Sequence, residues 1–159
     1  MAYAATTNVA VSKTKGDIDG LLRKHKASGF GVFEEATRAI LVFEMGGRRI
    51  VFHLPLPNQA DKQFTHYKRG YREHRRSVDA ALASWEQACR SRWRALFLCI
   101  KAKLESIESG IENFEDAFLA HIQMPDGHSV SEHVRPRIAQ AYETGSMQPL
   151  LPPPSGKAD

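Results

Sequence analysis

Residues 62–76 combine basic and aromatic side chains at high density and are called the basic strip below. The strip contains six Lys or Arg residues and one acidic residue, Glu73. Proteins that bind single-stranded nucleic acid use this combination, because cations follow the phosphate backbone and aromatic rings stack on bases of any identity. The sequence therefore predicts a nucleic-acid contact surface made of Lys62, Phe64, Tyr67, Lys68, Arg69, Tyr71, Arg72, Arg75 and Arg76.

The basic strip also holds the whole basic excess of the chain. The 159 residues include 22 Lys or Arg and 18 Asp or Glu, which gives a formal net charge of +4. Setting aside the six bases and one acid of the strip leaves 16 basic and 17 acidic residues. Two alternatives stay open for the strip. One is a solvated loop without a ligand, the usual role of a charge run, and the other is a surface that binds an acidic, nucleic-acid-like protein.

Two arginines that follow the basic strip extend this predicted surface. At 100° per residue on a helix, Arg90, Arg94 and Lys101 fall on one flank, within about 40° of one another. Glu105 continues the same flank, so the basic part belongs to the half of the helix next to the strip. We therefore expect Arg90 and Arg94 to contribute to nucleic-acid binding.

A group of polar residues towards the C-terminus contains the side-chain types that bind metal ions. It consists of His121, Asp126, His128, Glu132 and His133. The spacing H-x6-H-x3-E-H matches no standard zinc pattern, and neither cysteine is near it, so the sequence predicts polar turn residues and no metal site. No catalytic residue or cofactor is predicted either. There is no G-x-S-x-G motif, and Gly29-Phe30-Gly31 leads into a strand rather than into the helix N-terminus of a phosphate loop.

Residues 30–54 carry the clearest strand pattern. GFGVF predicts a short first strand, and RAILVFEM and RRIVFHL flank Gly46-Gly47, the signal of a two-residue hairpin turn. That turn would pair Phe43 with Ile50 on one continuous apolar face, which we expect to be the core. The opposite face is half polar and therefore open to solvent or to a partner.

Helices are predicted before and after these strands in the sequence. The first spans about 14–27, and the second, about 78–110, has an apolar residue at every third or fourth position. Those positions are Trp85, Cys89, Trp93, Leu96, Ile100, Leu104, Ile107 and Ile111. Ser129 and Glu132 form a capping box for a last helix that ends near Thr144.

The predicted fold is α+β, with an N-terminal helix, a three-stranded antiparallel sheet, a long amphipathic helix and a smaller C-terminal helical region. We expect a disordered tail at 1–11, a single domain at 12–146 and a Pro-rich tail at 147–159. No apolar run approaches the roughly 18 residues of a membrane span, and the N-terminus lacks signal-peptide features. Cys89 and Cys99 lie about 15 Å apart along one predicted helix, too far for a disulfide. The sequence thus predicts a soluble cytoplasmic protein with reduced thiols and no membrane partner, and homo-oligomerisation through the long apolar stripe stays open.

Five runs of sequence between residues 14 and 127 resemble a family of small proteins encoded by tailed phages and prophages. They are TKGDIDGLLRKH, FEMGGRRIVFHLPLP, WEQACRSRWRAL, IKAKLESIESGI and FLAHIQMPDG. The resemblance implies a phage gene product that acts in the bacterial cytoplasm, and it supplies no catalytic residues. The predicted order of a helix, three strands and a long helix is also similar to the core of single-strand annealing proteins, which bind DNA in a positive groove as rings.

These features together predict a non-enzymatic phage protein of DNA metabolism that binds single-stranded DNA during annealing, recombination or replication. The first alternative is a phage protein that uses the same basic strip to bind and inhibit a host or defence protein. A nuclease or another enzyme is the second alternative.

Overall fold

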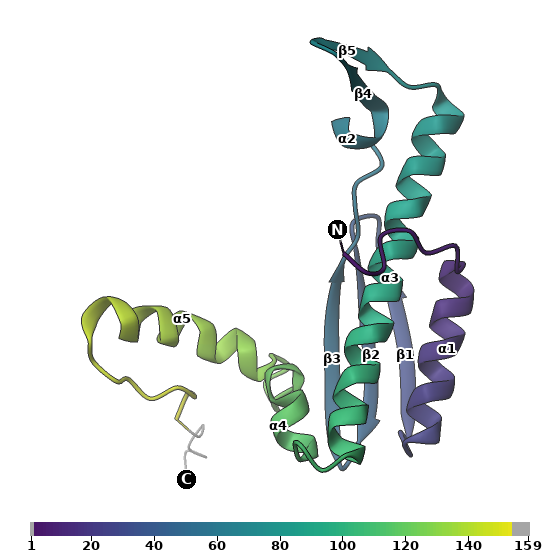
Figure 1. Ribbon diagram of the computed structural model, residues 1–159. Helices are drawn as coiled ribbons and strands as arrows, with labels where there is room; N and C mark the ends of the chain where they lie inside the picture. Colours follow the sequence, from purple (N-terminus) through teal and green to yellow (C-terminus); the bar gives the residue numbers. More distant parts are fainter. Residues whose placement is uncertain (1, 154–159) are drawn as a thin grey trace.

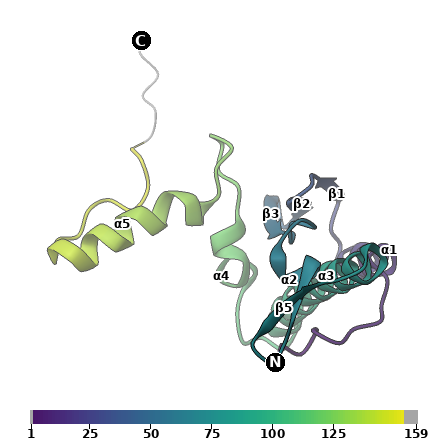
Figure 2. The ribbon, with the colours of Figure 1, turned by 90° about the horizontal axis from the view of Figure 1, so that it is seen from above.

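A three-stranded antiparallel sheet packs behind two helices in the computed structural model, which describes residues 2–153 (Figure 1). The strands, in spatial order, are β1 (Gly29–Glu34), β2 (Arg38–Met45) and β3 (Arg48–Pro55). The helices α1 (Val11–Lys24) and α3 (Val78–Glu108) cover the same face of the sheet, as the view from above shows (Figure 2). This arrangement is the predicted α+β class with its elements in the expected order.

The Gly46-Gly47 turn sets the register of β2 and β3. Both glycines have positive φ, 58° and 71°, which the tight two-residue turn of a hairpin requires. Phe43 lies opposite Ile50 as predicted, and both side chains are fully buried. A Cβ at Gly46 would lie 3.2 Å from the ring of Phe114, a tight contact that adds to the backbone strain of any side chain at this positive φ.

The buried face of the sheet forms one core with the helices. Ile18 and Leu22 of α1 and Trp93 of α3 are buried in the same cluster as Phe43. The short helix α4 (Phe114–Phe118) closes this core, because the Phe118 ring packs edge-on against the Phe43 ring with 5.7 Å between centroids.

The apolar stripe of α3 is the surface that packs on the sheet. Its buried members are Cys89, Trp93, Leu96, Ile100 and Leu104. Trp85 is only half-buried, and Ile111 is 78% exposed. The predicted stripe is therefore wrong at Ile111, because α3 ends at Glu108 and Gly110, with φ 71°, turns the chain away.

Residues 2–10 lie against α3 instead of forming the expected disordered tail. The Ser91 hydroxyl donates a hydrogen bond of 2.9 Å to the carbonyl of Ala4, and the Gln87 amide donates to the carbonyls of Ala5 and Thr7 at 3.1 and 2.9 Å. The Ala4 side chain is buried. Small side chains allow this backbone to approach the helix closely, and the polar side chains of α3 then pair with its carbonyls.

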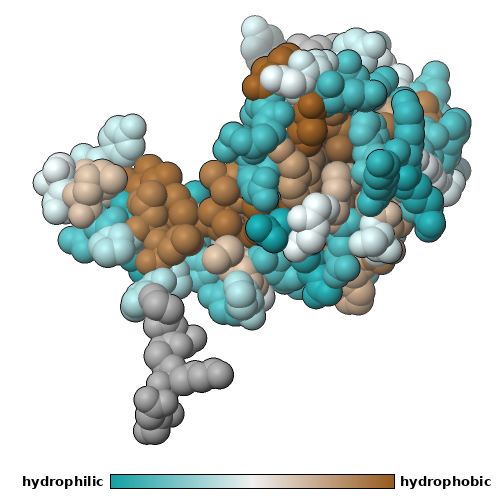
Figure 3. All heavy atoms as spheres, turned by 90° about the horizontal axis from the view of Figure 1, so that it is seen from below, coloured by the Kyte–Doolittle hydropathy of each residue, from teal (hydrophilic) through white to brown (hydrophobic). Residues whose placement is uncertain are grey.

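The C-terminal region extends away from the sheet (Figures 1 and 2). After α4 follow a 3₁₀ turn, η1 (Leu119–His121), and α5 (Val130–Thr144). The predicted capping box is present, since Ser129 and Glu132 each accept a hydrogen bond from the other's backbone N–H. No residue of α5 is buried. Ile138 and Tyr142 line an exposed recess together with Met147 and Leu150, where apolar side chains gather on the surface (Figure 3).

The predicted Pro-rich tail begins at residue 147, and residues 147–153 form no helix or strand. Residues 154–159 of that tail, like residue 1 of the N-terminal one, lie outside the described residues. Across the part of the chain that the structure covers, no helix has both the length and the apolar character needed to cross a membrane.

We expect Leu96→Ala or Ile100→Ala to lower the free energy of unfolding by about 2–5 kcal/mol, because each leaves a cavity between α3 and the sheet. Chemical denaturation measures this loss. Ile111→Ala is the matched control and should change stability little, because that side chain is 78% exposed. Equal stability of the Leu96→Ala and Ile111→Ala variants would show that the stripe is not the core.

Candidate nucleic-acid interface

The basic strip folds as a short helix and a β-hairpin that projects beyond the end of the sheet (Figure 1). Its elements are α2 (Lys62–Thr65), β4 (His66–Arg69) and β5 (Arg72–Arg75), and the two strands are called the hairpin arm below. Gly70 is the first of two central residues in the arm's turn and has a φ of 62°. Glycine at this position is a known hairpin signal, but the flanking strands have no apolar alternation that would reveal them in the sequence.

The register of the arm separates its side chains onto two faces. Because side chains alternate along a strand, directly opposite residues share a face. One face carries Tyr67, Arg69, Arg72 and His74, and the other carries His66, Lys68, Glu73 and Arg75. The first face therefore contains two cations and no acid, whereas on the second Lys68 lies opposite Glu73.

The cations of the arm lack ion-pair partners within the part of the chain that the structure describes. Among residues 2–153, none of the ion pairs involves a Lys or Arg of the basic strip. Arg69 and Arg72 are exposed and lie directly opposite one another beside the turn. Like charges at such positions destabilise a hairpin, and an anion bound between them would remove that cost.

The aromatic residues of the basic strip have different environments. Tyr71, in the turn, is fully exposed, and Tyr67 is 42% exposed with its ring stacked on His74 at a centroid distance of 5.4 Å. Phe64, in contrast, is only 4% exposed. A buried ring cannot stack on a base, so the structure removes Phe64 from the predicted stacking residues.

Phe64 instead helps to anchor the arm where α2 contacts α3. The backbone N–H of Arg76 donates to the carbonyl of Thr65 at 2.8 Å and closes the base of the hairpin. The Trp85 indole N–H donates to the carbonyl of Pro57 at 2.7 Å and ties the preceding connection to α3. Arg76 is half-buried and donates to the His66 carbonyl, so it helps to close the end of the hairpin arm next to α2. Lys62 is exposed on α2.

Arg90 and Arg94 do not join the arm. Arg94 forms an ion pair with Asp17 at 3.1 Å and lies over the Phe97 ring, and hydrogen bonds from Lys13 and then Arg94 lower the pKa of Asp17. Arg90 donates two hydrogen bonds to the Gln87 side chain. It also lies about 18 Å along α3 from the first residue of that helix. The predicted extension of the basic surface along α3 is therefore not seen.

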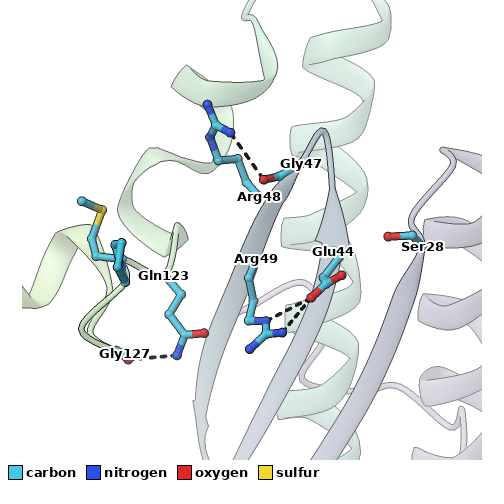
Figure 4. Close-up of a pocket in the computed structure, with 9 residues that line it drawn as sticks. Ser28, Glu44, Gly47, Arg48, Arg49, Gln123 and Gly127 are labelled. Atoms are coloured by element: carbon cyan, nitrogen blue, oxygen red, sulfur yellow. Dashed lines mark hydrogen bonds and ion pairs between the residues drawn. The ribbon is translucent and has the colours of Figure 1, made fainter.

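A separate recess beside the β2–β3 turn is lined by two arginines (Figure 4). Each has a glutamate partner: Arg49 pairs with Glu44 in the recess, and Arg48 lies 3.7 Å from Glu115 outside it. The recess has a volume of about 550 Å³ and is lined in part by Glu44, Arg48, Arg49 and Gln123. The Arg49 guanidinium donates to one Glu44 oxygen at 2.8 and 3.2 Å. The Gln123 amide is also engaged, since it donates to the Gly127 carbonyl. The free positive charge thus belongs to the hairpin arm and not to this recess.

No family model, no curated protein and no solved structure matches this chain. The two resemblances drawn from the sequence therefore stay predictions, and the geometry of the hairpin arm is what supports a functional proposal.

Phe64→Ala should loosen the hairpin arm while leaving the sheet folded, because Phe64 is the buried residue of α2 and α2 packs against α3. We expect faster amide hydrogen exchange at the amides of β4 and β5 that the ladder protects, with little change in β2 and β3. Mass-spectrometric exchange measures both regions in one experiment. Tyr71→Ala is the control, because a fully exposed ring makes no packing contact whose loss would speed amide exchange. Unchanged exchange in the arm of Phe64→Ala would contradict an anchoring role.

Proposed function

We propose that this protein binds single-stranded DNA through the hairpin arm, without catalysing a reaction on it, as an accessory in DNA annealing, recombination or replication. The observation that carries the proposal is the placement of Arg69 opposite Arg72, both exposed and neither in an ion pair within the described chain. The assignment to a phage rests on the sequence resemblance alone.

Phosphate binding accounts for the charge pattern of the arm. A phosphate between Arg69 and Arg72 would accept hydrogen bonds from both guanidinium groups and remove their mutual repulsion. Lys68 and Arg75, on the opposite face, widen the positive field around the same two strands. Such contacts carry no base information, so we expect binding with little sequence preference.

The exposed rings favour a single strand over a duplex. Tyr71 at the tip and the Tyr67–His74 stack offer ring faces to unpaired bases. Bases in a duplex already stack on one another, whereas those of a single strand are free to stack on a side chain. A two-stranded ribbon can also enter the major groove of duplex DNA, so tighter binding to duplex is the specific result that would change this proposal.

A protein partner is the alternative use of the same arm. Unpaired arginines on a projecting hairpin would equally match an acidic protein surface that imitates DNA. The inhibitor hypothesis and the DNA hypothesis differ in what the purified protein binds on its own, and the experiment below separates them.

Fluorescence anisotropy with a labelled mixed-sequence oligonucleotide, measured over a range of salt concentrations, tests the proposal. Each phosphate contact to a single strand contributes about 0.7 to the slope of log affinity against log salt. Because Arg69 and Arg72 share one phosphate, Arg69→Gln with Arg72→Gln should reduce that slope by about 0.7. Lys24→Gln with Lys101→Gln removes the same charge from exposed positions away from the arm and is the matched control.

Tyr71→Ala should weaken binding by about 1–3 kcal/mol and leave the salt slope nearly unchanged, because stacking releases few counterions. Three outcomes would reject the proposal: equal loss in the Lys24/Lys101 control, tighter binding to the duplex, or no binding at low salt. In the last case, capture of an acidic protein that the Arg69/Arg72 variant fails to capture would support the inhibitor hypothesis.

A further inference from the structure

A second group of chemically active side chains lies where the C-terminal region joins β3. Asp126 and His128 belong to a tight turn, and His133 lies at the start of α5. One oxygen of Asp126 and one ring nitrogen from each histidine lie within 4.8 Å of one another. These residues do not satisfy a sequence pattern for zinc, yet the turn and the helix bring them together.

The other two residues of the predicted polar group have different partners. The His121 ring stacks on Phe52 at a centroid distance of 3.9 Å, and burial lowers the pKa of this histidine. Glu132 accepts the backbone N–H of Ser129 in the capping box, which lowers the pKa of its carboxyl. The cluster is therefore limited to Asp126, His128 and His133.

The spacing of the three ligand atoms suits one small cation. Bonds of about 2.0–2.1 Å in tetrahedral geometry place two ligand atoms about 3.3 Å apart. In the cluster, His133 Nε2 lies 2.7 Å from Asp126 Oδ2 and His128 Nδ1 lies 3.8 Å from Asp126 Oδ1. These distances fall on either side of the required value, and the three ligand atoms all lie within 4.8 Å of one another, so no pair has to close by more than about 1.5 Å.

His133 Nε2 gives an independent reason to expect an ion. The atom is buried and has no hydrogen-bond partner of acceptable geometry, although Asp126 Oδ2 is 2.7 Å away. A buried ring nitrogen whose contact with an acceptor is poorly aligned loses part of the stabilisation that a well-aligned hydrogen bond supplies. A short contact with poor hydrogen-bond alignment is what two ligands of the same ion show, because both then direct their lone pairs at the ion and not at each other.

The backbone holds this cluster before any ion binds. Asp126 Oδ1 accepts the backbone N–H of His128 at 3.1 Å, a contact that lowers the pKa of the aspartate. The N–H of Met124 donates to the carbonyl of His128 at 2.7 Å, and Gly127 has a φ of 89°. The capping box fixes the start of α5 and with it the position of His133.

We propose that Asp126, His128 and His133 bind one divalent transition-metal ion of the zinc class. Two imidazole nitrogens and one carboxylate suit this class better than Ca²⁺ or Mg²⁺, which prefer oxygen ligands. Asp126 and His128 are exposed, so water can occupy a fourth position. The ion would join α5 to the turn between η1 and α5 and hold the start of α5 in place. This role is independent of the hairpin arm.

Metal titration of the full-length, untagged protein tests the proposal. The Cys99→Ser background removes the exposed thiol, which could bind zinc by itself. Zinc affinity is read by competition with a chromophoric chelator, and Co²⁺ reports the geometry through its visible absorption. Asp126→Asn keeps an oxygen that can accept the His128 backbone N–H but loses the charged metal ligand. His133→Asn removes the imidazole nitrogen that would bind the ion. The control, His25→Asn, removes one histidine elsewhere.

The expected result is one zinc ion per chain, a tetrahedral Co²⁺ spectrum and a higher melting temperature with zinc. Each ligand variant should bind zinc roughly 100-fold more weakly, since changes outside the coordination shell alone cost about 10–100-fold. The control should bind like the wild type. Absence of binding, unchanged affinity in Asp126→Asn and His133→Asn, or an equal loss in the control would each overturn the proposal. DNA binding by the hairpin arm should not change in these variants.

Discussion

The packing of α3 against the apolar face of the sheet positions every other part of the molecule. The 31 residues of α3 span about 46 Å, whereas the eight-residue strands β2 and β3 span about 26 Å. The helix is therefore longer than the sheet that it covers. Its free N-terminal turns carry the base of the hairpin arm through α2 and Trp85. At its other end, Gly110 turns the chain back so that Phe118 can enter the same core.

Local signals made the central fold predictable from the sequence. The Gly46-Gly47 turn sets the register of β2 and β3. A slip of one residue in their pairing would move every apolar side chain of the slipped strand to the wrong face of the sheet. The stripe along α3 repeats with the helical period, and the Ser129–Glu132 capping box marks a helix start by residue type alone. In each case the residues that determine the element are close together in the chain.

The parts that escaped prediction depend on contacts that no local pattern encodes. The strands of the hairpin arm have no apolar face, so Gly70 was the one turn signal there. Phe64 is buried in α2, which packs against a helix further along the chain. Arg94 looked free on a helical wheel, but Asp17, which pairs with it, belongs to another helix. Residue types indicated the charge of the candidate site correctly, whereas which of its members face solvent depends on tertiary packing.

The docked N-terminal segment has a consequence for how the chain folds during its synthesis. The carbonyls of Ala5 and Ala4 bond to side chains 82 and 87 residues further along the chain. Ribosomes release the N-terminus first, so this segment emerges long before its partners on α3 exist. The β2–β3 hairpin needs only neighbouring residues and can form early. Residues 2–10 are thus made before α3 but reach their final place only after it.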